Sequence, residues 1–333
     1  MTIPMIIDAD PGLDDALAIL LALGSPEVDL IGVTTVAGNT NLANTTANAL
    51  RILELADRGD VPVAAGAARG LIREAPRTAE HVHGSDGLGG LPLPPPKTRP
   101  VDAPAVDFIA ERLRESAEPI TIVAIGPLTN VALLLAIHPA AAARIGRLVI
   151  MGGAARGGNS TPTSEFNVRS DPEAAYRVFA AGLPLTMVGL DATDRSVVTA
   201  KDVDALRGGG RIARFVVGAV DYYSRFHQDR YGATVTYQHD ALALAEAIAP
   251  GIVHTNRLYV EVEYGQGPTR GTTVVDLHGV TGHVPNTQVA LDFDHPRFVD
   301  LLVSRLSALD DRSEGTVRPR GEQPPGISRP GTC

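Results

Sequence analysis

The sequence predicts an α/β protein whose central, mostly parallel sheet is flanked by helices. Short apolar runs rich in β-branched residues alternate with segments of helical pattern, as in chains built from strand–helix–strand units. The runs do not alternate polar with apolar residues, which is typical of strands covered on both faces. With 333 residues, 44% of them hydrophobic, the chain can bury a substantial core.

The expected elements follow one another in order from the N-terminus. Ile3–Asp8 is a strand that ends in a carboxylate, and Asp14–Leu23 is a helix whose first residues are acidic, where the helix dipole favours negative charge. The other strands are expected at Val28–Ala37, Val61–Ala65, Ile120–Ile125, Arg147–Gly153 and Leu183–Asp191, and the other helices from Asn41 or Thr45 to about Asp57, over 128–137, and over Asp171–Ala181.

Three stretches depart from this alternation. Residues 66–103 have loop composition, and residues 204–255 have a helical pattern that includes the aromatic-rich run DYYSRFHQDRYG. Residues 311–333 are rich in Pro, Gly and Arg and lack apolar periodicity, which predicts a disordered tail. The sequence therefore predicts one domain over residues 1–310.

Charge and composition exclude several classes of protein. The 29 basic residues are outnumbered by 38 acidic ones, a net charge of −9 that fits neither nucleic acid nor an anionic membrane, although a local basic patch stays compatible with it. The one cysteine, Cys333, excludes an internal disulfide framework. The longest apolar run, Ala16–Leu23, is too short to span a bilayer, and the N-terminus lacks a basic segment of signal-peptide type, so we expect a cytoplasmic protein.

A cluster of carboxylates follows the first strand. Asp8, Asp10, Asp14 and Asp15 lie within eight residues, with a Pro-Gly turn between them. This turn is expected at the carboxyl ends of the strands, where α/β sheets bind ligands. Converging carboxylates repel one another, so the pattern predicts a bound cation, and all-oxygen ligands favour Ca²⁺ or Mg²⁺ over zinc.

The carboxylate cluster fits neither an EF-hand nor simple helix capping. An EF-hand loop counted from Asp8 would need glycine and glutamate where Leu13 and Ile19 stand. Helix capping accounts for one carboxylate, but not for four after a buried strand. A Mg²⁺-dependent phosphohydrolase with a strand-end Asp nucleophile is the main alternative. The shortage of lysine weakens it, since Lys97 and Lys201 are the only two, although arginine can substitute.

Further polar groups stand at predicted strand ends and helix starts. Asn39 follows the second strand, and Ile125 leaves a free carbonyl before Gly126-Pro127. Glu165 and Asn167, if extended, would point to the same face. Each signal is weak alone, but together they offer the carboxylates and amides that suit a sugar; the remaining members of this set are Met151, Asn159, His239 and Asp240.

The sequence resembles the inosine-uridine-preferring nucleoside hydrolase family over roughly Ile3 to Leu306. DADPGLDDALA matches the family's Asp-x-Asp-Pro-Gly-x-Asp-Asp signature, and VAGNTNLANTTANAL, GPLTNVALLL, MGGA, EFNVRSDPEAA and HDALAL match further family blocks in order. The resemblance implies a single α/β domain that hydrolyses ribonucleosides to ribose and free base in nucleoside salvage or catabolism. It also implies one Ca²⁺ per chain and a homodimer or homotetramer.

The resemblance also implies roles for individual residues. One Ca²⁺ would be held by Asp10, Asp15, Asp240 and the backbone carbonyl of Ile125. The family often has threonine at that last position, and isoleucine is harmless if only the carbonyl binds. The expected ribose contacts are Asp14, Asn39, Met151, Asn159, Glu165 and Asn167, and the expected base contacts are His83, His239, Tyr223, His227 and Tyr231.

The chemistry of the residues agrees with this activity. Cleavage of a ribosyl C–N bond develops oxocarbenium character, which a carboxylate-rich pocket stabilises. Asp10 can take a proton from the attacking water. His239 would titrate in the range suited to the leaving base. His83 matches a histidine of the base pocket, although His81 is close enough to leave the choice open.

Substrate preference and non-enzymatic alternatives complete the predictions. The chain has no tryptophan, so it lacks the indole with which purine-specific relatives grip a purine, and uridine, cytidine or inosine is the expected substrate. A nucleoside- or ribose-binding protein without chemistry, or a Ca²⁺-stabilised structural protein, would lack a proton-transfer residue. Asp10, Asp15 and His239 are all present, which disfavours both alternatives.

Overall fold

The eight-stranded sheet at the centre of the molecule is parallel except at one edge. The computed structural model describes residues 2–73, 75–232 and 234–315, but not the side chains of Arg230 and Tyr231. The order of the strands in the sheet is β3-β2-β1-β4-β5-β6-β12-β9, and β9 alone runs antiparallel to its neighbour. The strands are β1 (Ile3–Ala9), β2 (Val28–Thr35), β3 (Val63–Ala65), β4 (Ile120–Ala124), β5 (Ile145–Met151), β6 (Leu185–Val188), β12 (Thr287–Phe293) and β9 (Val253–Leu258).

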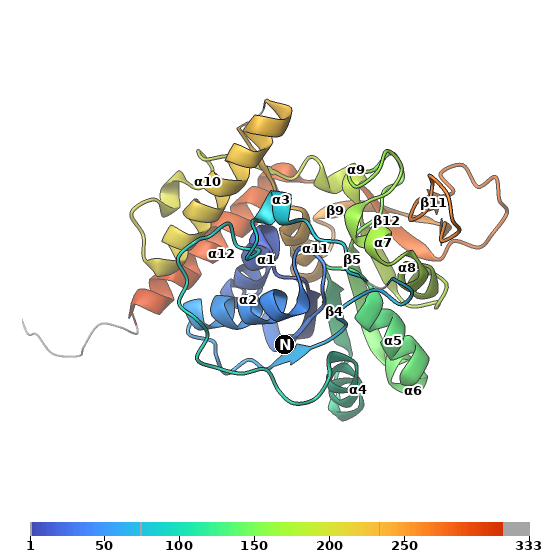
Figure 1. Cartoon of the computed structure of the whole chain (residues 1–333), viewed down its shortest axis with the longest axis horizontal. Helices are drawn as coiled ribbons and strands as arrows, with labels where there is room; N and C mark the ends of the chain where they lie inside the picture. Colours follow the sequence, from blue (N-terminus) through green and yellow to red (C-terminus); the bar gives the residue numbers. More distant parts are fainter. Residues whose placement is uncertain (1, 74, 233, 316–333) are drawn as a thin grey trace, which may run out of the picture.

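Helices cover both faces of this sheet (Figure 1). One hydrophobic cluster joins the sheet to α1 (Leu13–Gly24), α2 (Leu42–Leu55), α10 (Arg211–Tyr231), α11 (His239–Ile248) and α12 (His295–Gly315). A second cluster joins the opposite face to α4 (Ala105–Glu115), α5 (Thr129–Ile137), α6 (Pro139–Ala142) and α8 (Pro172–Phe179).

Helix α1 is the central helix of the first cluster. All its residues are buried, including Asp14 and Asp15, because α11 and α12 pack on the side that the sheet leaves uncovered. A helix that is apolar all round is expected in such a position. The burial of α1 fixes the place of the two carboxylates in its first turn.

Several short elements complete the fold. They are α3 (Glu80–His83), α7 (Phe166–Ser170), α9 (Leu190–Thr193), a 3₁₀ turn η1 (Asp204–Leu206), the pair β7 (Val197–Val198) and β8 (Thr236–Tyr237), and the hairpin β10 (Val260–Val262) with β11 (Thr273–Val275).

The structure confirms the predicted fold class and corrects some details. Residues 311–315, assigned to the disordered tail, continue helix α12, because Ser313 is buried and the Arg312 side chain donates to the carbonyls of Leu23 and Gly24 at the end of α1. The rest of that predicted tail, 316–333, lies outside the described residues. The segment 204–255 is not helical throughout, since it also contains β8 and the start of β9. Within the described residues, no helix is long and apolar enough to cross a membrane.

Candidate active site

A cavity of about 620 Å³ opens at the carboxyl ends of the parallel strands. The walls come from the segments that follow β1, β2, β4, β5 and β6, together with α3, α7, α10 and the start of α11. Among the residues expected from the sequence, the structure brings together Asp14, Asn39, His83, Ile125, Met151, Asn159, Glu165, Asn167, Tyr223, His227, His239 and Asp240. The side chain of Tyr231 lies outside the described residues.

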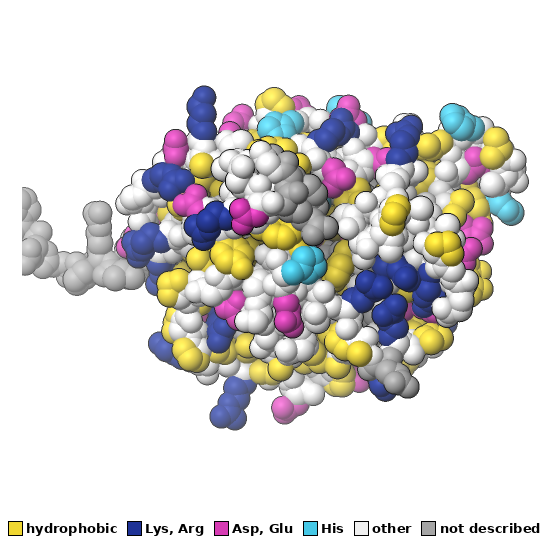
Figure 2. Space-filling view, turned by 45° about the horizontal axis from the view of Figure 1, so that its top comes forward, with side chains coloured by type: hydrophobic (Ala, Val, Ile, Leu, Met, Phe, Trp, Pro, Cys, Tyr) yellow, Lys and Arg dark blue, Asp and Glu magenta, His cyan; other side chains and the backbone are white. Residues whose placement is uncertain are grey.

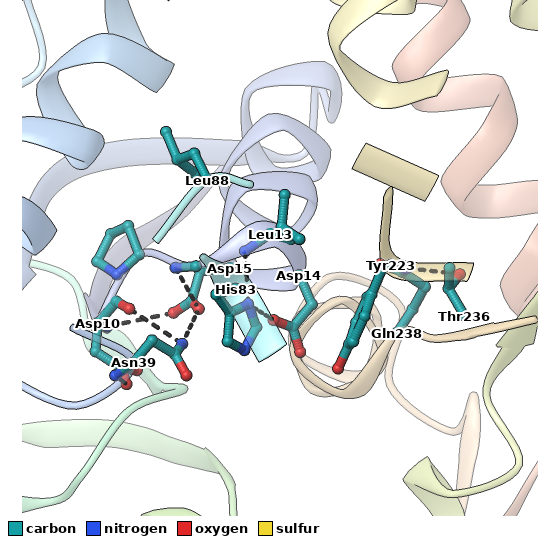
Figure 3. Close-up of polar contacts among 12 residues, drawn as sticks. Asp10, Leu13, Asp14, Asp15, Asn39, His83, Leu88, Tyr223, Thr236 and Gln238 are labelled. Atoms are coloured by element: carbon teal, nitrogen blue, oxygen red, sulfur yellow. Dashed lines mark hydrogen bonds and ion pairs between the residues drawn. The ribbon is translucent and has the colours of Figure 1, made fainter. Parts of the chain in front are cut away.

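The Asp-Pro-Gly turn fixes the first carboxylates. Asp15 accepts hydrogen bonds from the backbone N–H groups of Gly12 (2.9 Å) and Asp10 (3.2 Å), so it closes the turn at the start of α1. The Asn39 amide donates to Asp15 Oδ2 at 2.9 Å and to the Asp10 carbonyl at 3.1 Å (Figure 3). A Cβ atom at Gly12 would lie 2.7 Å from both Asn39 Nδ2 and His83 Nδ1, so only glycine fits this turn.

Three buried carboxylates converge in front of this turn. Oxygens of Asp14, Asp15 and Asp240 lie within 4.8 Å of one another, and a buried oxygen of Asp14 has no hydrogen-bond partner among the described residues. Burial, followed by mutual repulsion, raises the pKa of Asp14 to about 8 and that of Asp240 well above its usual range. Burial also raises the pKa of Asp15 to about 6. This set of oxygens could hold a metal ion, which would offset the repulsion.

Asp10 is a fourth buried carboxylate, close enough to Asp14 and Asp15 to be repelled by them. Its Oδ2 accepts from the Asn39 backbone N–H at 2.6 Å, whereas its buried Oδ1 has no partner in the described part of the chain. A Cβ atom at Gly126 would lie 2.5 Å from Oδ1, so the glycine makes room for the carboxylate. Burial, followed by repulsion from Asp15, raises the pKa of Asp10. The sequence led us to expect Asp10 together with Asp15 and Asp240 as metal ligands. The three carboxylates whose oxygens lie within 4.8 Å of one another include Asp14 and not Asp10.

The backbone around Glu165 and Asn167 has a different conformation from the one that the sequence predicted. They are not extended: Glu165 is the N-cap of α7 and accepts from the backbone N–H groups of Asn167 (2.8 Å), Val168 (3.0 Å) and Gly153 (3.0 Å). The Asn167 amide donates to the carbonyls of Ile125 (2.9 Å) and Met151 (3.1 Å). A carbonyl oxygen has two lone pairs, so that of Ile125 keeps one for a further partner.

The His83 ring contacts the start of helix α1 and lies near Asp14. Its Nδ1 accepts from the Leu13 backbone N–H at 3.2 Å and lies 4.0 Å from Asp14 Oδ1, so Nε2 carries the proton of the neutral ring. Burial is the main cause that lowers the pKa of His83 to about 3. His81 also lines the cavity but is exposed, so His83 is the buried histidine of the two that the sequence left open.

Burial moves the pKa of His239 below the physiological range, which differs from the expectation drawn from the sequence. Burial, followed by the neighbouring His227, lowers its pKa to about 4. Its Nδ1 shares a hydrogen bond of 2.9 Å with the Thr193 hydroxyl. A neutral imidazole can still donate one N–H to a substrate.

Sequence reasoning missed three aromatic residues of the cavity, Phe166, Phe226 and Tyr237. Phe226 and Tyr237 join a row of rings in which His227 lies 4.6 Å from Tyr223, 5.3 Å from Phe226 and 4.9 Å from Tyr237 between ring centroids. Phe226 is three residues after Tyr223 on α10, a spacing that places both on one helix face and could have identified it. Arg77 and Asp194 also line the cavity and were not expected from the sequence.

Comparison with known proteins identifies the family. The profile described as inosine-uridine preferring nucleoside hydrolase matches residues 5–300. The chain is 46% identical over 308 residues to proteins of Escherichia coli and Salmonella enteritidis named pyrimidine-specific ribonucleoside hydrolase RihA, covering 92% of this chain and 99% of each relative.

Solved structures agree with this similarity. A plant nucleoside hydrolase superposes with a TM-score of 0.88 at 35% identity, covering 92% of this chain and 100% of the other. A purine-preferring ribonucleoside hydrolase from Gardnerella vaginalis superposes with a TM-score of 0.88 at 34% identity, covering 93% and 99% of the two chains. The chain therefore belongs to the inosine-uridine preferring nucleoside hydrolase family and is a ribonucleoside hydrolase.

Proposed function

We propose that this hydrolase acts on pyrimidine ribonucleosides, uridine and cytidine first, with inosine as a slower substrate, and that it requires Ca²⁺. The observation that carries the proposal is the convergence of three buried carboxylates, Asp14, Asp15 and Asp240, in a cavity whose other end is lined by imidazole and phenol rings. The relatives named as pyrimidine-specific and the absence of tryptophan from the sequence support the base preference.

The donor set fits a calcium ion. We propose Asp10, Asp15, Asp240 and the Ile125 carbonyl as its protein ligands, because the acidic oxygens are buried, mutually repelling and in part without partners. Calcium accepts oxygen ligands in irregular geometries, which suits a set drawn from a turn, a strand end and a helix start. When bound, Ca²⁺ supplies positive charge that orients hydroxyl groups and lowers the pKa of water.

Asp10 is the proposed general base. The Asn39 N–H holds Oδ2 at 2.6 Å, which leaves the partnerless Oδ1 to take the proton of the attacking water. Asp14, Asn39, Asn159, Glu165 and Asn167 are the proposed contacts of the ribose hydroxyls. The acidic end of the cavity then favours the positive charge that develops on the ribose ring as the C–N bond breaks.

The imidazoles at the other end are proposed to assist the leaving base. When the Thr193 hydroxyl donates to Nδ1 of His239, Nε2 carries the proton and can donate it to the base. Nε2 of His83 is likewise a donor, because its Nδ1 accepts from the Leu13 N–H. Tyr223, His227, Phe226 and Tyr237 provide the surface against which the base packs.

A release assay over a panel of nucleosides tests the proposal. We expect ribose release from uridine and cytidine, less from inosine, and much less from 2′-deoxyuridine, because the acidic end loses the 2′-hydroxyl. Exhaustive chelation should abolish turnover and lower the melting temperature, and Ca²⁺ should restore both better than Mg²⁺. Strict preference for adenosine and guanosine would overturn the base assignment, and indifference to chelation would overturn the metal assignment.

Two further properties are proposed on the resemblance to the family alone. They are a homodimeric or homotetrameric assembly and a cytoplasmic location. Light scattering on the purified protein and fractionation of the cells that produce it test them.

A further inference from the structure

Three arginine side chains lie close to one another beside the cavity, and one of them lines it. Arg73 and Arg77 lie in the segment between β3 and α3, and Arg169 lies in the last turn of α7. Arg77 lines the cavity together with Asn159 and Ser160. Figure 2 shows basic side chains gathered to the right of the centre on the face that it displays. We call Arg73, Arg77 and Arg169 the rim arginines.

The rim arginines have no acidic partner in the part of the chain that the structure describes. Their side chains make no hydrogen bond or ion pair there, and the Nε atoms of all three, with Nη1 of Arg169, are buried without an acceptor. Arg270 next to them is different, because it donates to both carboxylate oxygens of Glu173, at 2.6 and 2.7 Å. Within the described residues, no carboxylate therefore pairs with the rim arginines; Glu74, which stands between Arg73 and Arg77 in the chain, lies outside the described residues.

Burial and repulsion by neighbouring arginines lower the pKa of both Arg77 and Arg169. Burial, followed by the charges of Arg77, Arg73 and Arg270, lowers the pKa of Arg169. Burial, followed by Arg73, lowers the pKa of Arg77. An anion between the groups would remove this repulsion, as a cation would among the buried carboxylates.

The fold anchors the segment that carries two of the rim arginines. Asp171, the N-cap of α8, accepts from the Leu71 backbone N–H at 2.9 Å and from the Thr129 hydroxyl at 2.6 Å. A Cβ atom at Gly70 would lie 3.1 Å from the Asp171 carboxyl carbon, so the chain passes close to α8. The segment is thereby held beside the helix pair α7 and α8, next to Arg169.

We propose that the rim arginines bind a phosphate group. Guanidinium groups recognise phosphate through paired, charge-assisted N–H donors, and the buried Nε atoms supply donors that the protein leaves unused. Two sources share this chemistry: inorganic phosphate, and the 5′-phosphate of a nucleoside monophosphate whose ribose lies in the cavity.

The second source rests on the proposed ribose contacts. Arg77 lines the cavity together with Asn159, and Arg169 lies close enough to Arg77 for their charges to interact. The acidic end of the cavity would repel a phosphate on the 2′- or 3′-hydroxyl. A phosphate on the 5′-carbon is the one that can lie near the rim while the ribose keeps its proposed contacts.

Phosphate binding is tested without turnover, on the full chain. Inorganic phosphate and uridine 5′-monophosphate are titrated by ³¹P NMR into wild type, the double variant Arg77→Ser/Arg169→Ser, and the control Arg69→Ser, an exposed arginine of the same segment. We expect the double variant to bind at least about tenfold more weakly, since hydrogen bonds to charged groups are lost, and the control to bind within about twofold of wild type. Equal affinities in all three proteins would overturn the proposal.

Kinetics with uridine separate the two sources. Competitive inhibition by uridine 5′-monophosphate that the double variant loses supports the nucleotide. Non-competitive modulation by inorganic phosphate, also lost in the double variant, supports free phosphate. The absence of both effects, with no difference in affinity, contradicts the site. Because the titration does not depend on turnover, an inactive enzyme that still binds phosphate would count against the proposed function and not against the rim arginines.

Discussion

The two ends of the cavity are constructed differently. At the acidic end, Asp10, Asp15 and Glu165 are buried and held by backbone N–H groups at strand ends and helix starts. At the base end, Tyr223, Phe226 and their neighbours come from one face of α10 and from β8, and contact one another mainly through their rings. If the proposed function is correct, we expect the reaction to depend mainly on the groups at the sheet edge and the choice of base to depend mainly on the side chains of α10 that line the cavity.

The strongest test of this division is the substitution Asp10→Asn. It keeps the shape and the contact with the Asn39 N–H, but it removes the proposed base. We expect kcat on uridine to fall by about 10³–10⁴-fold, the upper range for general base catalysis, with the fold retained. The exposed Asp102→Asn is the matched control and should be unchanged. Near-normal turnover of Asp10→Asn protein loaded with metal would refute the role of Asp10.

His239→Ala tests whether the base end takes part in chemistry. We expect a loss of about 10²-fold or more on uridine, because an N–H donor to the departing base is removed. A nitrophenyl riboside, whose leaving group needs no proton, should lose less than about tenfold.

The control for His239→Ala is His254→Ala, an exposed histidine on β9. Equal losses on the two substrates would show that His239 does not act on the leaving group.

Asn167→Ala should have an intermediate effect. The variant loses the donors to the carbonyls of Ile125 and Met151 and a proposed ribose contact. About 1–3 kcal/mol for buried hydrogen bonds corresponds to a decrease in kcat/KM of roughly 5–150-fold. The effect should be similar for uridine and inosine, whereas the exposed Asn256→Ala should show none. A loss confined to one base would mean that the two ends are not separate.

Phe226→Leu should have the smallest effect, confined to the base end. Replacing a ring in the aromatic row is worth about 0.5–1.5 kcal/mol, so KM should rise by roughly 2–12-fold with kcat retained. The ratio of uridine to inosine hydrolysis should change as well. The exposed Tyr264→Leu serves as control. If Phe226→Leu lowers kcat equally on every substrate, helix α10 also positions the reacting groups.

The same division explains what the sequence could predict. Asp10, Asp14 and Asp15 are close together in the chain and follow a recognisable strand, so these carboxylates could be placed at the edge of the sheet. Asp240, which is far away in the chain, could be connected with them only through the resemblance to the family. Glu165 and Asn167 were assigned the wrong local geometry, because two polar residues around Phe166 fit a strand as well as a capped helix.

Long-range pairing accounts for most of the remaining omissions. Strand β9 (VHTNRL) lies at the edge of the sheet and is largely exposed, so it lacks the apolar run that marks the central strands. β12 was not predicted either, and its place between β6 and β9 depends on partners far away in the chain. Tyr237 could not be assigned to the cavity without knowing that β8 pairs with β7.

The acidic residues of the cavity come from distant parts of the sequence, so they are synthesised at different times. Asp15 is made early, but Asp240, whose oxygens meet those of Asp15 and Asp14, is 225 residues later, and the sheet is closed only by β12 at Thr287–Phe293. At about 5–20 residues per second, the ribosome needs roughly 10–45 s between the two carboxylates. During that interval α1 lacks α11 and α12, so its apolar surface is uncovered. The complete set of acidic residues can therefore assemble only after α11 and β12 have been synthesised.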